Sequence, residues 1–307
     1  MPINLNPSPQ EKQTLLNGRI VAHLGRALLV EDNEGNTIHC KKCTQLEHPA
    51  VGDYVTWIRT EQGAGRVEKI LERKSLLSRP SKNGKTRPVA ANLNQIVVIL
   101  AVKPTIDLLL LDQYLIVCEF QKIAPLIVLN KTDLLDDASK IEIDDLTLIY
   151  QSLGYEIIKV SAKNKSGLNI LRKRLQNETS LLVGQSGVGK STITNALLPD
   201  LELQTKTLST ASGLGKHTTT SSTLYKLPEG GDIIDSPGVN IFGLAHITEQ
   251  SLGQGFREIE QLAWQCKYNN CLHIKEPKCA VKDGVENNSI SKQRYLRYLK
   301  LRDKLAY

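Results

Sequence analysis

The chain has 307 residues, of which 40% are hydrophobic and 23% charged, so it is long enough for two or three globular domains. No apolar run reaches the roughly 18 residues that a membrane span needs. The first residues, MPINLNPSPQEKQ, lack the apolar core of a signal peptide, so we expect a cytoplasmic protein without membrane contact. The formal net charge of +7 favours a polyanionic partner.

A small β-barrel is predicted near the N-terminus. Residues 18–40 indicate two β runs around a polar turn at Asn33–Asn36, and the runs GDYVTWI and GRVEKIL follow, each opened by glycine. Many short strands with glycine turns and no long helix favour a five-stranded barrel of the OB type. With its polar N-terminal tail, which we expect to be flexible, this first domain is predicted to span residues 1–75.

Residues 76–90 are predicted to be a basic linker, with four Lys or Arg and no acid between positions 78 and 90. Apolar strand patterns then alternate with helical ones. The expected strands are NQIVVILAV, APLIVLN, EIIKVSA, TSLLVG, STLYKL and DIID, and the expected helices cover about 108–120, 138–153, 167–176 and 189–198. This alternation predicts a doubly wound α/β sheet in residues 91–245, with ligands at the carboxyl ends of the strands.

A phosphate-binding loop is predicted at residues 184–191, GQSGVGKS, which match G-x-x-x-x-G-K-S between a strand and helix-forming residues. Its glycines allow successive backbone N–H groups to point at phosphates, and the helix N-terminus adds its dipole. We expect Lys190 to neutralise the β- and γ-phosphates and the Ser191 hydroxyl to ligate Mg²⁺. The predicted binding residues here are Gly184, Gln185, Ser186, Gly187, Val188, Gly189, Lys190, Ser191 and Thr192.

Two further loops are predicted to read guanine. Asn-Lys-x-Asp ends the strand APLIVLN, and the Asp133 carboxylate can accept two hydrogen bonds from guanine, which adenine cannot supply. Asn130 would tie neighbouring loops together, and the stem of Lys131 would cover the base. The tripeptide SAK follows the next strand, where a backbone N–H can meet guanine O6. The predicted base-binding residues are Asn130, Lys131, Thr132, Asp133, Ser161, Ala162 and Lys163.

The guanine-reading loops precede the phosphate loop, whereas an ordinary GTPase has the opposite order. The sequence therefore predicts a circularly permuted GTPase. In DIIDSPG, Asp235 is predicted to hold Mg²⁺ through its water shell and Gly238 to approach the γ-phosphate. In GLGKHTTTSSTL, one of Thr218, Thr219 and Thr220 is expected to bind Mg²⁺, and we favour Thr219.

The residue after Gly238 is Val239, at a place where many GTPases carry a glutamine that orients the attacking water. Valine cannot orient water, so we expect slow intrinsic hydrolysis and a water-positioning group from elsewhere. His217 is the local candidate, and the alternative is a solvated loop histidine. Together with Lys190 and Thr219, it makes up the predicted catalytic set.

The third predicted domain, residues 246–307, is mainly helical and contains 11 Lys and Arg against 7 Asp and Glu. It contains Cys266-x4-Cys271-x-His273-x5-Cys279. Three thiolates and one imidazole in a chain without a secretion signal predict a closed, tetrahedral, structural Zn²⁺ site.

Three further cysteines receive a different interpretation. Cys40 and Cys43 lack a second pair, so we interpret them as strand residues beside a basic loop, and Cys118 as a core residue. The basic C-terminal helix carries Tyr295 and Tyr298, and two alternatives remain open for it. It either contacts nucleic acid or packs on the zinc unit.

The barrel, the ordered motifs NKTD, SAK, GQSGVGKS, GKHTTT and DSPG, and the Cys/His cluster together resemble the RsgA family, also called YjeQ or YloQ. These are ribosome small-subunit-dependent GTPases of bacteria, and the resemblance covers about residues 15–285. It implies a late-acting assembly factor that binds the small ribosomal subunit near the decoding region and whose GTP hydrolysis the ribosome stimulates. It also implies that the barrel and the zinc domain touch ribosomal RNA, and that His217 matches the histidine proposed as catalytic in the family. The implied cofactors are GTP or GDP with Mg²⁺ and one structural Zn²⁺, and we expect a monomer.

Two other functions compete with this one. In the first, the chain is an RNA-binding module in which GTP only sets the conformation, but intact Lys190, Ser191 and Asp235 argue against a dead site. In the second, it is a signalling GTPase with a protein activator and no RNA. The barrel, the zinc unit and the basic charge balance argue against that alternative.

Overall fold

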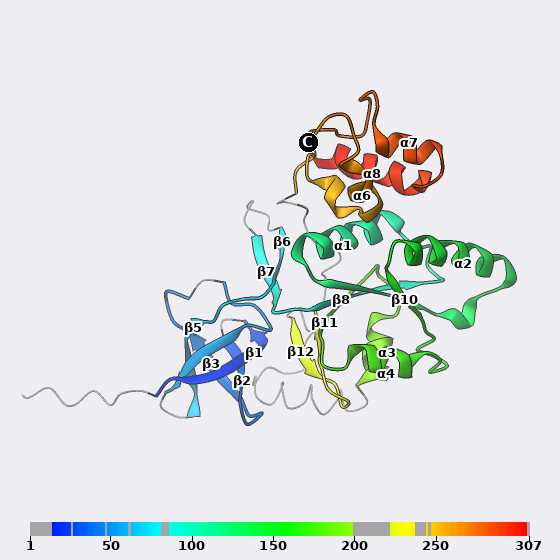
Figure 1. Cartoon of the computed structure of the whole chain (residues 1–307). Coiled ribbons are helices and arrows are strands. Elements are labelled where there is room, and N and C mark those ends of the chain that lie inside the picture. Colours follow the sequence, from blue (N-terminus) through cyan, green and yellow to red (C-terminus); the bar gives the residue numbers. More distant parts are fainter. Residues whose placement is uncertain are drawn as a thin grey trace, which may run out of the picture.

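The computed structural model describes residues 14–25, 27–46, 48–60, 63–80, 86–198, 222–236, 244 and 247–305. They form a β-barrel, an α/β sheet beside it and a helical C-terminal unit that lies against one helical layer of the sheet (Figure 1). Among these residues, no helix is long and apolar enough to cross a membrane.

The barrel has five strands: β1 (Leu16–Leu24), β2 (Ala27–Asp32), β3 (Thr37–Lys42), β4 (Tyr54–Arg59) and β5 (Gly65–Ile70). They pair in the order β1-β2-β3-β5-β4, with β3 and β5 parallel, and β4 pairs back with β1. This closed arrangement confirms the predicted OB-type barrel. Its core packs tightly, since a Cβ on Gly65 would lie 2.6 Å from Cys40 Sγ and 2.9 Å from the buried Trp57 ring.

One detail of the barrel prediction was wrong. The first of the two expected β runs is divided into β1 and β2, because the chain reverses at Gly25. Gly25 has φ +63°, a conformation that glycine adopts without steric cost. The expected polar turn at Asn33–Asn36 does separate β2 from β3.

The segment expected to be a linker contains an antiparallel β-hairpin, β6 (Leu76–Pro80) and β7 (Thr86–Ala91). Its apolar side chains explain the difference. Leu77 is 2% exposed and Ala90 is fully buried, and both join the core under the α/β sheet. The hairpin is therefore packed structure between the barrel and the sheet.

The α/β sheet contains the strands β8 (Gln95–Ala101), β9 (Ala124–Asn130), β10 (Glu156–Lys159), β11 (Thr179–Val183), β12 (Thr223–Lys226) and β13 (Asp232–Asp235). Their order is β10-β9-β8-β11-β13-β12, and only β12 is antiparallel to its neighbour. From β8 the chain moves outward through β9 to β10, then returns to β11 on the other side of β8. The crevice between the carboxyl ends of β8 and β11 is thus the topological switch point, where such sheets bind ligands.

Helices cover both faces of this sheet (Figure 1). One face carries α1 (Leu108–Gln121) and α2 (Asp137–Ser152), and the other carries α3 (Leu168–Leu175) and α4 (Lys190–Leu197). Strand β8 shows why both layers form, because Ile96 and Val98 pack in the first layer while Val97 and Ile99 pack in the second. This matches the continuous apolar run that predicted a buried parallel strand.

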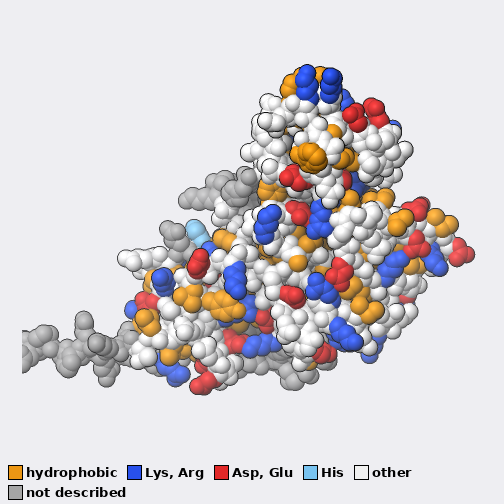
Figure 2. Space-filling view, viewed as in Figure 1, with side chains coloured by type: hydrophobic (Ala, Val, Ile, Leu, Met, Phe, Trp, Pro, Cys, Tyr) orange, Lys and Arg blue, Asp and Glu red, His pale blue; other side chains and the backbone are white. Residues whose placement is uncertain are grey.

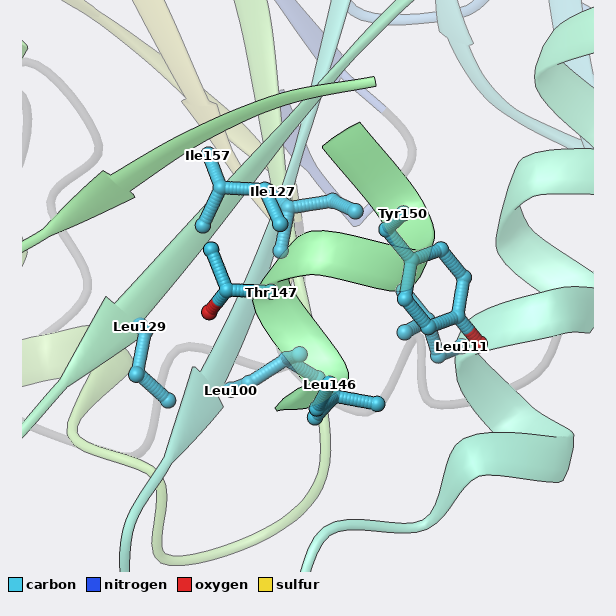
Figure 3. A pocket seen from close by; sticks show the side chains of 8 residues that line it. All are labelled: Leu100, Leu111, Ile127, Leu129, Leu146, Thr147, Tyr150 and Ile157. Atoms are coloured by element: carbon cyan, nitrogen blue, oxygen red, sulfur yellow. The ribbon is translucent and has the colours of Figure 1, made fainter. Parts of the chain in front are cut away.

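A gap of about 10 Å³ lies between α2 and the sheet. In Figure 3, Thr147 of α2 faces the strand side chains of Ile127 and Ile157, and the Tyr150 ring lies beside Leu111 of α1. A space of that size holds one water molecule at most. This gap is therefore too small for a nucleotide.

The barrel continues the α/β sheet through its first strand. Ala22 of β1 pairs with Thr223 of β12, so that all eleven strands of barrel and sheet form one hydrogen-bonded series. Arg19 of β1 donates from Nη1 to Asp232 Oδ2 at 2.5 Å and from Nη2 to Thr179 Oγ1 at 3.0 Å. Both charged side chains are 16% exposed, which reduces solvent screening of this ion pair. The barrel is thus fastened to the two strands that carry Asp235 and the phosphate loop.

The C-terminal unit consists of η3 (Leu252–Gly255), α6 (Arg257–Ala263), α7 (Ala280–Glu286) and α8 (Lys292–Leu305). Its core includes Ile116 of α1, and a Cβ on Gly255 would lie 2.7 Å from that side chain. In α8, Tyr298 is 1% exposed and its hydroxyl donates to the Leu272 carbonyl at 2.9 Å. Of the two alternatives for this helix, its tyrosines therefore support packing on the Cys/His unit.

Candidate nucleotide site and metal centre

The phosphate loop connects β11 to α4 at the carboxyl edge of the sheet. Gly184, Gly187 and Gly189 have φ values of +147°, +79° and +94°, in the region that favours glycine. Close packing adds a second constraint, because a Cβ on Gly184 would lie 2.2 Å from the Ile99 carbonyl oxygen and one on Gly189 2.5 Å from Asn130 Nδ2. These glycines thus allow both the loop curvature and its contact with neighbouring strands.

Lys190 is half-buried at the start of α4, and its Nζ donates to the carbonyl oxygens of Gly184 at 2.6 Å and Gln185 at 3.0 Å. Burial lowers the pKa of Lys190, and the nearby Asp235 carboxylate partly opposes this. Burial likewise raises the pKa of Asp235 despite the attraction of Lys190. The charges of Lys190 and Asp235 therefore act on each other's pKa.

Asn130 connects three loops from a buried position at the end of β9. Its Nδ2 donates to the Val188 carbonyl at 2.9 Å, and its Oδ1 accepts from the Ala162 N–H at 3.1 Å. It is 2% exposed. Lys131 extends the connection, because its Nζ donates to the Gly187 carbonyl at 2.6 Å and to the Lys103 carbonyl at 2.8 Å. These hydrogen bonds thus connect the loops predicted to bind guanine to the Gly187–Val188 limb of the phosphate loop.

Asp133 lies beside Ser161, whose Oγ donates to Asp133 Oδ1 at 2.5 Å. This hydrogen bond is the main reason that the pKa of Asp133 is lowered, and the charges of Lys163 and Lys131 contribute. The carboxylate is therefore ionised at neutral pH and oriented by a neighbouring loop. Thr132 is held by the Val160 carbonyl, which accepts from its hydroxyl at 3.0 Å and from its N–H at 3.2 Å. This Ser161–Asp133 contact was not predicted, because it joins two loops that are 28 positions apart.

An open cavity of about 500 Å³ lies over the phosphate loop. That volume is in the usual range for small-molecule sites. Its lining combines one base-reading residue with the phosphate loop and the start of α4: Lys131, Ser186, Gly187, Gly189, Lys190, Ser191 and Thr192. The structure therefore brings the two predicted halves of the site together. Gly238, His217 and Thr219 lie outside the described residues.

The Cys/His cluster has the dimensions of a tetrahedral metal site. The four ligand atoms of Cys266, Cys271, His273 and Cys279 all lie within 4.8 Å of one another. Cys266 Sγ is 3.9 Å from Cys279 Sγ, and these sulfurs are 3.6 and 3.5 Å from His273 Nδ1. Tetrahedral Zn²⁺ with ordinary bond lengths requires about 3.8 Å between sulfurs and about 3.6 Å between sulfur and nitrogen. The cluster can therefore hold a metal ion, with Nδ1 as the imidazole ligand.

The loop that supplies Cys271 and His273 is braced from two sides. The Tyr295 hydroxyl donates to the His273 carbonyl at 2.6 Å. The Glu276 carboxylate accepts from the N–H groups of Leu272, Ile274 and Lys275. Burial alone would raise the pKa of Glu276, but these backbone hydrogen bonds lower it to about 2. Sequence analysis missed this role of Glu276, since only the folded loop turns three N–H groups towards one side chain.

The remaining cysteines are in the predicted places. Cys40 is 1% exposed in the barrel core, where burial raises its pKa to about 12, and Cys43 Sγ lies 3.5 Å from the Glu68 carbonyl. Cys118 is 1% exposed in α1, as expected for a core residue.

Comparisons with known proteins agree with this geometry. A family model described as RsgA GTPase matches residues 70–245. The small ribosomal subunit biogenesis GTPase RsgA of Haemophilus influenzae strain PittGG is 43% identical over 281 residues, which cover 90% of this chain and 81% of the relative. The protein of the same name from Chromohalobacter salexigens is 41% identical over 293 residues, covering 94% of this chain and 86% of the relative.

Two solved structures have the same architecture over almost the whole chain. YjeQ from Thermotoga maritima matches with a TM-score of 0.79 and 32% identity, covering 95% of this chain and 99% of that one. YloQ, described as a circularly permuted GTPase, matches with a TM-score of 0.75 and 29% identity, covering 98% of both chains. The permuted motif order is therefore a property of a known fold.

Proposed function

Because this chain belongs to the RsgA GTPase family, we propose that it is a GTP hydrolase that acts in the biogenesis of the small ribosomal subunit. The observation that carries the proposal is the joining of guanine-reading and phosphate-binding residues by Asn130 and Lys131. The part of the proposal that concerns the small ribosomal subunit comes from the names of the relatives. The proposal extends to binding of that subunit, stimulation of hydrolysis by it, a late step of maturation and work in the cytoplasm as a monomer.

In this proposal GTP lies across the carboxyl edge of the sheet. The Asp133 carboxylate accepts from the base, the SAK loop from Ser161 to Lys163 supplies a backbone N–H to guanine O6, and the Lys131 stem covers the ring. Lys190 neutralises the β- and γ-phosphates, and the loop glycines present N–H groups to them. Ser191 and Thr219 would ligate Mg²⁺, and Asp235 would hold its water shell. The bound metal would supply neutralisation of the phosphate charge.

Hydrolysis requires a group that orients the attacking water, and Val239 cannot do so. We assign this role to His217, with Gly238 near the γ-phosphate. Slow hydrolysis by the isolated chain follows from the missing glutamine. A subunit that positions the loop containing His217 would then raise the rate, which gives the stimulation a physical cause.

The barrel and the C-terminal unit are proposed to contact ribosomal RNA, with one structural Zn²⁺ in the cluster formed by Cys266, Cys271, His273 and Cys279. Support comes from the net charge of +7, although the view in Figure 2 shows basic and acidic side chains interspersed over most of that face. Basic side chains gather there at the outer end of the C-terminal unit. Phosphate contacts release counterions, so subunit binding is expected to weaken steeply with salt.

The first test is GTP turnover with and without purified small subunits, with ATP and large subunits as controls. Slow basal turnover that rises many-fold only with GTP and small subunits supports the proposal. Flat turnover despite tight GTP binding would contradict stimulation and favour the RNA-binding module in which GTP sets the conformation. Equal stimulation by a protein fraction free of RNA would favour a signalling GTPase.

His217→Ala tests the catalytic assignment in the same assay. Its nucleotide affinity should stay near that of the wild type, and most stimulated turnover should disappear. His48→Ala, at an exposed position next to the barrel, is the matched control at saturating subunit concentration. Full stimulated turnover in His217→Ala would remove this residue from the mechanism.

A further inference from the structure

A second cavity, of about 280 Å³, adjoins the phosphate cavity. Three parts of the chain line it: the first turns of α1, the phosphate loop and the end of α8. Its lining residues are Asp107, Leu109, Leu110, Gln113, Gln185, Ser186 and Lys304. Ser186 also lines the 500 Å³ cavity, so the two spaces meet at that residue. The C-terminal unit therefore reaches the edge of the nucleotide site through Lys304.

The position of this second cavity follows from the sheet topology. The α1 helix begins after β8, and the phosphate loop follows β11, the neighbouring parallel strand. Both segments therefore leave the sheet at its carboxyl edge, on either side of the topological switch point. The cavity lies in the crevice where a doubly wound sheet binds its ligand.

The limb of the phosphate loop that borders this cavity is the one farther from the base. Lys131 and Asn130 hold the other limb, through the carbonyl oxygens of Gly187 and Val188. On the limb that borders the cavity, the carbonyl oxygens of Gly184 and Gln185 accept hydrogen bonds from Lys190. Lys190 is the residue expected at the β- and γ-phosphates. Gln185 and Ser186 therefore border the end of the site that the terminal phosphate of GTP would occupy.

Lys304 is held at this place by the helix that carries it. Arg297 lies two turns earlier on almost the same face of α8, about 10 Å along the axis, and its Nε donates to Asp112 of α1 at 2.5 Å. Between them, Leu301 is fully buried. Asp112, which holds Arg297, is directly followed in α1 by Gln113, which lines the cavity. The hydrogen bond that anchors α8 and the cavity therefore lie on the same turn of α1.

The charges around the cavity leave the Lys304 ammonium available to an anion. Among the described residues that line the cavity it is the one cation, and no carboxylate in the described ranges forms an ion pair with it. The acid that faces the cavity, Asp107, caps α1 by accepting from the Leu110 N–H at 3.0 Å. An exposed ammonium at the end of a helix anchored by Arg297, in a cavity that the phosphate loop also lines, is suited to an anion that approaches from the nucleotide side.

We propose that Lys304 senses the terminal phosphate of bound GTP, so that the C-terminal helix favours GTP over GDP. This inference rests on the proposed function. The added phosphate of GTP places more negative charge at the Gln185–Ser186 limb than GDP does, and Lys304 acts on that difference. One unit charge that acts through partly solvated space changes affinity by about three- to tenfold.

The test measures dissociation constants for GDP and for the non-hydrolysable analogue GMPPNP with the full-length chain at low salt. Lys304→Ala should weaken GMPPNP binding by about three- to tenfold while GDP binding stays within twofold. Lys304→Arg should restore the wild-type ratio. Lys292→Ala removes the same charge from the opposite end of α8, about 18 Å away, and should leave the ratio unchanged.

An unchanged ratio in Lys304→Ala would overturn the inference, and so would an equal loss of affinity for both nucleotides. A ratio that falls equally in Lys292→Ala would show a general charge effect and would also overturn it. Wild-type protein that binds neither nucleotide would contradict the proposed function itself. Failure of the two proposals is therefore distinguishable in one experiment.

Discussion

Arg294 of α8 donates from Nη1 to Asp112 Oδ1 of α1 at 2.6 Å, across 182 positions of the chain. Both side chains are buried, with exposed fractions of 1% and 0%. Arg294 also donates from Nε to Glu258 of α6 at 2.5 Å, and the Tyr150 hydroxyl of α2 donates to Asp112 at 2.7 Å. One buried guanidinium therefore connects the C-terminal unit to both helices on that face of the sheet.

Replacing Arg294 by methionine should loosen the C-terminal unit. The side-chain volume is roughly kept, but Glu258 is left buried without its cation, and Asp112 keeps the Arg297 guanidinium and the Tyr150 hydroxyl as partners. Breaking a buried ion pair in this way costs about 3–5 kcal/mol. Urea unfolding gives the stability, and hydrogen exchange in peptides from α6 and α8 gives its location.

Arg66→Met is the matched control for that variant, because Arg66 pairs with Glu68 on the surface with side chains 48% and 29% exposed. Such a pair contributes at most about 1 kcal/mol. If Arg294→Met loses no more stability than this control, the buried network does not hold the units together.

Asp133→Asn should change the base preference. The carboxylate can accept from guanine N1–H and the 2-amino group, whereas an amide presents a donor that suits the carbonyl of xanthine. GDP affinity should fall by on the order of 100-fold or more, and xanthosine diphosphate binding should appear. Fluorescence titration with both nucleotides measures this exchange. Asp136→Asn, three residues later at the cap of α2, is the control and should keep its GDP affinity.

Asp235→Asn should raise the melting temperature by an amount that depends on pH, and it should lower GTP turnover. Burial raises the pKa of Asp235 in the folded protein, so keeping the group ionised there destabilises the fold. That cost is absent at pH values below the ordinary pKa of 3.8 and grows as pH rises through the raised value. The asparagine variant should therefore melt at a higher temperature than the wild type at pH 7, and the difference should shrink towards pH 4.

The same variant should lose most Mg²⁺-dependent GTP turnover, because a neutral amide holds the water shell of the metal weakly. Thermal melts between pH 4 and 8, together with Mg²⁺ titrations of turnover, check both halves. A melting difference that is largest at acid pH would refute the assigned direction.

Cys271→Ser should remove the metal and loosen the loop that Glu276 and Tyr295 brace. Structural zinc sites contribute directly to folding, so the variant should expose residues 264–280 to protease. Metal analysis of the wild type is expected to give about one zinc per chain. Cys43→Ser, outside the cluster, is the matched control and should keep its zinc. Zinc-free wild-type protein prepared without chelator would show that the cluster is not a zinc site.

Those parts of the protein whose chemistry is local could be predicted from the amino-acid sequence alone. The phosphate loop, the Asn-Lys-x-Asp motif and the Cys/His cluster each place their groups within 14 residues, where backbone geometry limits the arrangements. The periodicity of apolar residues was sufficient to predict the strands and helices of the α/β sheet. The order of the motifs was sufficient to predict the circular permutation. The polar turn at Asn33–Asn36 was equally visible, whereas the reversal at Gly25 lies between two apolar runs that were predicted as one β run.

How these parts meet became visible in the folded chain. The ion pair between Arg294 and Asp112, the pairing of Ala22 with Thr223 and the place of Lys304 beside Ser186 all join residues more than a hundred positions apart. No local propensity encodes such contacts, because they depend on which faces remain to be buried once each unit has folded. The same reason turned the expected linker into a packed hairpin and placed Tyr298 in the core of the C-terminal unit.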